Sequence, residues 1–331
     1  MRTTSLLTSS LLLALLAACS DSSRPPVAAI TTEAAAPAVA PAQRSEAAPR
    51  VTVIMKTLTN PFFVEMEQGA QQVQKEYSVD LQVKTATQET SIEQQIQLVE
   101  QEIQAGAKAI VIAPGDSTRL VPVLKKAQDK GIHIVNIDNQ LSAEAMAGIG
   151  MKPVPFISVN NEEGAYQSAK FVADKVHQPT DVAIIEGIRS ANNAQQRKKG
   201  AERAFAKNAN LRLVAVETAN WKIDEAYDVV QRIFKSHPEI GVVFCANDMM
   251  AIGVMKYLQE NGKTKVLVAG FDALEEAKTA IRAGQLSVTV DQQAARQGYL
   301  GVTTALQLIK GESQPLHIEV DTKLITADTL Q

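Results

Sequence analysis

The sequence VTVIMKTLTNPFF at residues 51–63 decides the fold. Its first five residues are apolar and rich in β-branched side chains, which predicts a buried strand. Asn60 and Pro61 then supply a helix N-cap and a residue whose φ is already helical. A strand therefore runs through a short loop into a helix. In open α/β sheets ligands bind beyond the carboxyl ends of the strands, so this loop is predicted to be the mouth of a ligand site.

Two phenylalanines open the predicted helix. Phe63 shares one helical face with the later apolar residues and is expected to pack on a sheet, whereas Phe62 falls outside this face. Phe62 is therefore a candidate ligand contact. The alternative is that both phenylalanines belong to the hydrophobic core, where such side chains are often buried.

Apolar runs and helical patterns alternate along the chain from Val51 onward. Strict alternation predicts parallel sheets with right-handed crossovers, whose strands are buried on both faces. About ten such units are too many for one compact sheet, so the predicted fold class is α/β with two doubly wound parallel-sheet lobes. The stretch 142–155 holds two glycines and two prolines and is predicted to mark a crossing between the lobes.

Residues 1–18 are predicted to be a secretory signal peptide. One basic residue, Arg2, precedes an apolar run that is too short to span a bilayer, which takes roughly 20 apolar residues. The sequence LAAC at 16–19 resembles a bacterial lipobox, which implies that Cys19 carries a lipid that anchors the chain to a membrane. The alternative is an ordinary signal peptide that is cleaved at a small-residue site.

Residues 19–50 are predicted to be the lipidated cysteine followed by a disordered tether. Their alanines, prolines, serines and threonines offer too little apolar surface to offset the entropy of ordering. The expected location is therefore the cell envelope, in the periplasm and anchored through Cys19. Sorting to the inner or the outer membrane stays open.

Composition excludes several classes of function. The net charge of -3 and the pI of about 5.9 give no basic surface for nucleic acid. Cys245 is the only cysteine besides Cys19 and is expected to be a buried, inert thiol. The four histidines lack metal-ligand spacing, so no metal and no cofactor is predicted. An enzyme is not expected, because nothing selects a nucleophile, although Asp138, Asp248 and Asp272 could act as paired carboxylates in sugar hydrolysis.

Polar side chains follow most of the predicted strands at their carboxyl ends. Because these ends meet at one edge of a parallel sheet, the side chains are expected to point into one cleft. Planar polar groups that donate and accept in fixed directions, beside the flat rings of Phe62 and Trp221, suit a ring sugar. The polar residues at these strand ends are Asp138, Asn139, Asn192, Asn193, Arg197, Asn220, Asn247, Asp248, Asp272, Asp291 and Gln292.

Each of these positions also has a simpler interpretation. Asn247 and Asp248 are good N-caps for the helix that begins at Met249, and Asp272 could cap the helix at Leu274. Arg197 begins a basic run that would usually be a solvated face, and Lys56 could extend along the surface from the end of its strand. Six strand ends with the same chemistry nevertheless favour a ligand site, since capping has no use for Trp221.

Five motifs together resemble the type I periplasmic sugar-binding proteins of ABC transporters, which include ribose and allose binders. The resemblance covers Val51 to about Ile325 and implies two lobes that close over a monosaccharide through a hinge of three crossing strands. It implies that the closed form docks on a membrane permease. The motifs are TNPFF at 59–63, NID at 136–138, RKKG at 197–200, NDMMA at 247–251 and GFD at 270–272. The implied N-terminal lobe is 51–159 with 292–321, and the C-terminal lobe is 160–291 with 322–331.

The resemblance also implies roles for individual residues. Phe62 and Trp221 would stack on the sugar ring, Asp138 and Asp272 would accept hydroxyl groups, and Arg197 would donate hydrogen bonds. By motif position the implied ligand contacts are Asn60, Phe62, Phe63, Asp138, Arg197, Trp221, Asn247, Asp272 and Gln292.

Two departures separate the chain from the ribose binders, whereas the LTNPF run at 58–62 with its preceding lysine, Trp221 and CAND at 245–248 resemble the allose binders more closely. This chain has Asn139 where ribose binders carry arginine, and Lys56 where they carry a small residue. Both residues are therefore added to the candidate ligand contacts. The loss of a charged bidentate donor at Asn139 could also suit a deoxy-sugar, another anomer or a linear polyol.

Other functions remain open at this point. The ligand could be a polyol, a nucleoside or a signalling furanone, or the protein could be a sensory receptor that presents sugar to a chemoreceptor or kinase. The ligand domain of a transcriptional regulator is disfavoured, because the signal peptide and tether stand where a DNA-binding domain would be. The protein is expected to act as a monomer.

Overall fold

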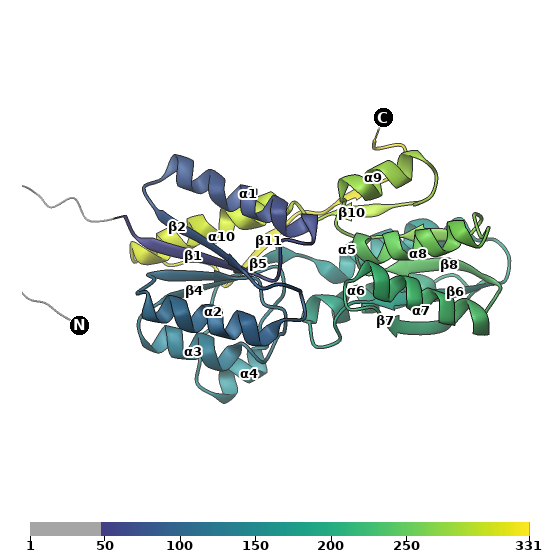
Figure 1. Ribbon diagram of the computed structural model, residues 1–331. Coiled ribbons are helices and arrows are strands. Elements are labelled where there is room, and N and C mark those ends of the chain that lie inside the picture. The colour runs from purple at the N-terminus through teal and green to yellow at the C-terminus, as the bar shows by residue number, and fades with distance from the viewer. Residues whose placement is uncertain (1–47, 331) are drawn as a thin grey trace, which may run out of the picture. The chain divides into compact units, whose positions relative to one another are not determined.

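The computed structural model describes residues 48–330, which lie within one compact unit (Figure 1). The predicted signal peptide, Cys19 and nearly all of the predicted tether lie outside the described residues. Strand β1 begins at Arg50, which was predicted to be the last tether residue, and this side chain forms an ion pair with Glu102 at 3.0 Å. Within 48–330 no helix combines the length and the apolar character needed to cross a membrane.

The first lobe is built on a six-stranded parallel sheet in the order β11-β5-β4-β3-β1-β2. Side chains alternate along β1, so that Val53 packs with α1 and α10 on one face while Ile54 packs with α2 and α3 on the other. The strands are β1 Arg50–Met55, β2 Asp80–Thr85, β3 Ala109–Ile112, β4 His133–Ile137, β5 Phe156–Val159 and β11 His317–Val320. The helices are α1 Pro61–Glu76, α2 Ile92–Gln104, α3 Val121–Asp129, α4 Ala143–Gly148 and α10 Ala294–Ile309.

The second lobe is built on a four-stranded parallel sheet in the order β7-β6-β8-β9. An antiparallel pair, β10 with β12, continues beside β9 through single bridges. Helix α5 packs on α6, and α7 packs on α8. The strands are β6 Thr180–Glu186, β7 Leu211–Thr218, β8 Ile240–Cys245, β9 Leu267–Ala269, β10 Thr289–Asp291 and β12 Lys323–Ile325. The helices are α5 Asn161–Ala173, α6 Asn192–Phe205, α7 Ile223–Ser236, α8 Asp248–Glu260 and α9 Glu275–Arg282.

The prediction that the stretch 142–155 crosses between the lobes is wrong. Residues 143–148 form α4, and the chain then returns to the first sheet as β5, next to β4. The glycines and prolines there end a short helix and turn the chain, which is a local role. The described chain passes between the lobes at three other places, namely from β5 to α5, from β10 to α10 and from β11 to β12 (Figure 1).

Helices α1 and α10 approach each other closely on one face of the first sheet. The contact depends on glycine, because a Cβ on Gly298 would lie 2.0 Å from the carbonyl oxygen of Met66. The backbones of the two helices therefore touch where one side chain is missing, and α10 is held against the helix that follows the opening strand.

We expect Gly298→Ala to lower the free energy of unfolding by about 1–3 kcal/mol, because the added methyl group forces the two helices apart. Urea denaturation measures this change. Gly148→Ala is the matched control, since a Cβ at that position has no neighbour within 4 Å. Equal stability of the two variants would show that the helices tolerate separation.

Candidate ligand-binding site

A cavity lies where the carboxyl ends of strands from both lobes converge. Its empty volume, which includes space open to solvent, is about 220 Å³. The lining is withdrawn from solvent, because every lining residue except Glu89 is at most 6% exposed. The lining residues are Lys56, Asn60, Phe62, Phe63, Glu89, Asp138, Asn193, Arg197, Trp221, Asn247, Asp272 and Gln292.

The cavity brings together ten of the eleven candidate residues, and Asn139 is the exception. Two further lining residues are not among the candidates. The sequence marks Asn193 only as a polar residue after a strand, whereas Glu89 lies in the polar loop between β2 and α2, where nothing in the sequence distinguishes it from its neighbours.

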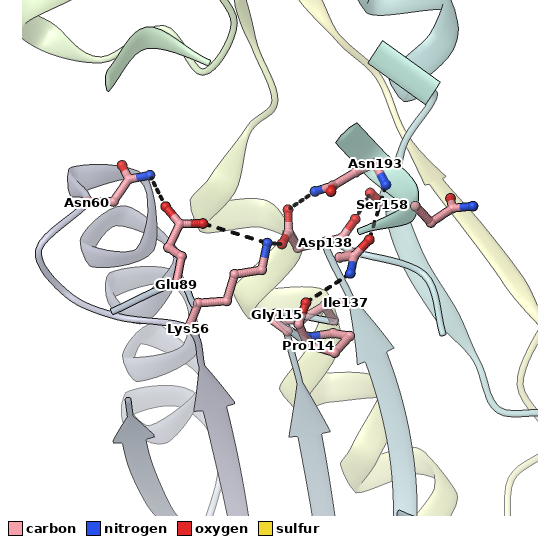
Figure 2. Close-up of polar contacts among 12 residues, drawn as sticks. Lys56, Asn60, Glu89, Pro114, Gly115, Ile137, Asp138, Ser158 and Asn193 are labelled. Atoms are coloured by element: carbon pink, nitrogen blue, oxygen red, sulfur yellow. Dashed lines mark hydrogen bonds and ion pairs between the residues drawn. The ribbon is translucent and has the colours of Figure 1, made fainter. Parts of the chain in front are cut away.

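A buried ion-pair network forms the part of the lining that comes from the first lobe (Figure 2). Lys56 follows β1 directly, and its Nζ lies 2.8 Å from Oδ2 of Asp138 and 3.9 Å from Oε2 of Glu89. Asn60 donates from Nδ2 to Oε1 of Glu89 at 3.0 Å. Burial raises the pKa of the Glu89 carboxyl, and the charge of Lys56 opposes that rise. The interpretation of Lys56 as a surface side chain is wrong, since it is 2% exposed.

The opening of α1 supplies both an amide and two aromatic rings. Asn60 caps the helix by accepting from the N–H of Phe62 at 3.1 Å, while its Nδ2 stays available to Glu89. Phe62 and Phe63 lie edge to face, with ring centroids 5.1 Å apart. Both rings belong to the buried core and both line the cavity, so the two interpretations of these residues are compatible.

Arg197 on α6 organises the part of the lining that comes from the second lobe. Its Nη2 donates to Oε1 of Gln292 at 3.0 Å, and its Nη1 lies 3.5 Å from Oδ1 of Asp272. Gln292 in turn donates from Nε2 to the same Asp272 oxygen at 2.5 Å. Burial lowers the pKa of Arg197 and raises the pKa of Asp272 well above its ordinary value, and the attraction between the two charges opposes both changes.

Arg197 is buried and does not belong to a solvated basic face, which was the simpler interpretation of the basic run that it begins. Arg197 is 3% exposed, whereas the side chain of its neighbour Lys199 is 71% exposed. The guanidinium lies 4.0 Å from the ring centroid of Phe271 and also donates to the carbonyl of Ala246 at 2.9 Å. Only the lysines of this run lie toward solvent.

Trp221 depends on a missing side chain opposite its ring. A Cβ on Gly187 would lie 2.1 Å from the indole, so only glycine leaves room for the ring there. The indole Nε1 is buried without a hydrogen-bond partner among the described residues, and so is Oδ1 of Asn193. Unpaired buried polar atoms are rare, and a ligand with hydroxyl groups can satisfy both a donor and an acceptor.

Three lining residues have backbone conformations that side chains seldom adopt. The φ angles are +62° at Asp138, +68° at Trp221 and +128° at Asp272. Such strain is costly and is concentrated at functional sites, where it aims side chains in directions that regular structure does not offer. Each of these turns follows a strand and presents its side chain to the cavity.

Of the three residues with a capping interpretation, only Asn247 caps the helix to which it was assigned. Asn247 accepts from the N–H of Met250 at 2.9 Å and thus caps α8 while it lines the cavity. Asp272 caps no helix, because α9 begins after Leu274, whose N–H donates to Oδ2 of Asp248 at 3.0 Å. Asp248 lies behind the cavity wall and holds the loop that carries Asp272.

Asn139 lies outside the lining and joins the two lobes. Its Nδ2 donates to the carbonyl of Pro114 at 3.0 Å, and its Oδ1 accepts from the backbone N–H of Asn193 at 3.1 Å.

Within residues 48–330 no cluster of three or more histidine, cysteine, aspartate or glutamate residues is suited to a metal ion.

A two-lobed α/β fold with a closed polar and aromatic cavity defines a protein that binds a small solute. Residues 51–313 match the periplasmic binding protein domain, and the chain belongs to that family, which is made of solute-binding proteins. The D-ribose/D-allose-binding protein of Pseudomonas aeruginosa is 37% identical over 289 residues, covering 84% of this chain and 89% of the relative. The D-allose-binding periplasmic protein of Escherichia coli is 34% identical over 282 residues, covering 84% and 91%.

A solved structure agrees with this assignment. The crystal structure of an ABC transporter periplasmic solute-binding protein from Actinobacillus succinogenes, with bound D-allose, has a TM-score of 0.81 and 35% identity. The match covers 85% of this chain and 99% of that chain. Nearly the whole of that protein therefore superimposes on the described part of this chain, both lobes included.

Asp248 gives the folded protein a pH dependence. Burial raises the pKa of its carboxyl to about 6, so the protonated form is favoured on folding. The resulting stabilisation, on the order of 3 kcal/mol, is complete below about pH 4 and is lost as the pH rises through about 6. We expect the free energy of unfolding of Asp248→Asn to fall less than that of the wild type between pH 4 and pH 7, as measured by urea denaturation.

The control for this measurement is Asp224→Asn, which changes an exposed carboxylate on α7. That variant should keep the pH profile of the wild type. Identical profiles for Asp248→Asn and the wild type would show that Asp248 does not titrate in this range.

Proposed function

We propose that this protein captures a monosaccharide of the ribose or allose type in the cavity between its lobes and delivers it to the permease of an ABC transporter. The observation that carries the proposal is the lining itself, which gathers paired planar polar groups and aromatic rings around one small cavity. The named relatives support the same ligand class.

The lining suits a neutral polyhydroxylated ring better than a charged solute. The cations Lys56 and Arg197 are already paired with the carboxylates of Asp138 and Asp272. A negatively charged ligand would therefore be repelled by these carboxylates, and a positively charged ligand by Lys56 and Arg197. Hydroxyl groups donate and accept at once, and can therefore bridge Asp138 or Asp272 on one side and the orphan indole N–H of Trp221 on another. The rings of Phe62 and Trp221 would cover the two faces of the sugar.

Closure of the lobes is proposed to be a population shift. A sugar that touches Asn60 and Asp138 of the first lobe and Arg197 and Trp221 of the second binds the closed form better, so it moves the equilibrium toward that form. The lobes are proposed to be 51–159 with 292–321 and 160–291 with 322–331, and the closed protein is proposed to act as a monomer without enzymatic activity.

The envelope location is proposed from the sequence. The lipobox-like LAAC at 16–19 supports lipidation at Cys19, and the polar stretch after it supports a tether that lets the binding body reach a permease. A sensory partner such as a chemoreceptor would use the same closed form and is the alternative outcome for the partner. Globomycin treatment of cells tests the anchor, because an unprocessed precursor should then accumulate.

We expect the emission of Trp221, the only tryptophan, to change on titration with D-allose or D-ribose. Calorimetry against a panel of aldopentoses, aldohexoses, ketoses and polyols should give saturable binding at micromolar or lower concentration, with no product formed. A polyol or nucleoside that binds when the aldoses do not would replace the monosaccharide assignment. Turnover of any bound sugar would contradict a pure binding function.

We expect Asp272→Asn and Arg197→Ala to weaken sugar binding at least tenfold, since each removes a charge-assisted hydrogen bond worth about 1.5–3 kcal/mol. Calorimetry measures the affinity and thermal unfolding verifies the fold. Lys199→Ala is the matched control on the same helix, because that side chain is 71% exposed. Wild-type affinity in both site variants would remove these residues from the ligand site.

A further inference from the structure

The start of helix α6 has no cap from its own lobe. The N-cap position is Ala191, whose side chain has no acceptor. The first N–H groups of a helix have no partner within the helix, so they need an acceptor from elsewhere. The N–H groups of Asn192 and Asn193, the first two residues of α6, find their acceptors in the other lobe.

Two side chains of the first lobe supply these acceptors. The N–H of Asn192 donates to Oγ of Ser117 at 3.0 Å, and the N–H of Asn193 donates to Oδ1 of Asn139 at 3.1 Å. The N–H of Ser117 also donates back to the carbonyl of Ser190 at 3.3 Å. Ser117 precedes α3 and Asn139 follows β4, whereas Ser190 and α6 belong to the second lobe.

The two capping side chains are held in position within the first lobe. Nδ2 of Asn139 donates to the carbonyl of Pro114 at 3.0 Å and to Oγ of Ser117 at 3.3 Å. The side chain of Asn136 donates to the backbone carbonyl of Asn139 at 2.8 Å. Asn139 is fully buried and Ser117 is 7% exposed. The acceptors are therefore already oriented for α6, and little side-chain freedom is lost when they meet it.

We propose that Ser117 and Asn139 form a latch that stabilises the closed form and so sets the affinity for the ligand without touching it. Neither residue lines the cavity, so neither would touch a ligand that is held there. The latch is nevertheless joined to the site, because Asn139 follows the lining residue Asp138 and caps the N–H of the lining residue Asn193. The effect on affinity rests on the proposed function, whereas the effect on closure does not.

The latch gives Asn139 a role although this residue lies outside the cavity. The amide oxygen of Asn139 accepts an N–H at the start of α6, where the helix dipole is positive. An arginine at this position has only N–H donors and could not accept a hydrogen bond from the N–H of Asn193. The identity of residue 139 therefore changes the closing equilibrium, and through it the ligand affinity.

The first test follows hydrogen exchange at the amides of Asn192 and Asn193 in the ligand-free full chain. We expect exchange at these amides to be about tenfold faster in Ser117→Ala and in Asn139→Ala than in the wild type, since an N-cap contact is lost in each. The matched control is Ser142→Ala, which removes a cap within one lobe, because Ser142 accepts from the N–H of Ala145 on α4. Indistinguishable exchange in the wild type and both latch variants would overturn the proposal.

The second test uses D-allose and stopped-flow emission of Trp221. The latch exists only in the closed form, so both variants should release the sugar about tenfold faster and associate at the wild-type rate, while Ser142→Ala should do neither. Release at the wild-type rate in both variants would overturn the role in affinity. Absence of any sugar binding by the wild type would contradict the proposed function alone, and the exchange experiment would still decide the latch.

Discussion

One buried guanidinium determines the shape of the second lobe's share of the cavity. Taking a charge out of water costs several kcal/mol unless its hydrogen-bonding groups are satisfied. Arg197 is satisfied by groups from four separate segments, so the ends of β8, β9 and β10 and the start of α5 must all meet at one point. Its partners are Asn161, Ala246, Asp272 and Gln292. These bonds therefore hold the four segments together around one guanidinium.

In the first lobe the buried cation is Lys56, whose charge is likewise paired with neighbouring groups. Lys56 lies between Asp138 and Glu89, and Asn60 ties Glu89 to the start of α1. Because the charges of both lobes are paired internally, the cavity presents strong hydrogen-bonding groups without a large uncompensated charge. A neutral solute can add bonds to these groups without the cost of burying another ion.

Much of this site could be predicted from the sequence, because the carboxyl ends of parallel strands must share one edge of a sheet. That rule located Asp138, Asn247, Asp272 and Gln292 without any coordinates. It could not separate Asp138 from Asn139, since the turn at φ +62° sends one side chain into the cavity and the next toward the other lobe. Glu89 was missed because a polar loop gives no sign of which carboxylate is buried.

The fold, too, was predicted where the sequence pattern is regular and was missed where short or irregular segments decide the path of the chain. The units predicted from alternating apolar runs, about ten in number, match β1–β10, whereas β11 and β12 give no clear apolar run because they are short and partly exposed. The supposed crossing at 142–155 was wrong because glycine and proline mark turns of every kind.

The route of the chain has a consequence for the order in which the protein can be built. The second sheet, β6 to β9, is continuous in sequence, but the first sheet needs β11 at its edge and α10 on its face. The lobe that is synthesised first therefore stays incomplete until α10 and β11, at 294–309 and 317–320, have emerged. Its apolar face beneath α10, which includes Val111 and Ile137, is exposed meanwhile. Such long-range closure slows folding and leaves the growing chain dependent on protection from aggregation.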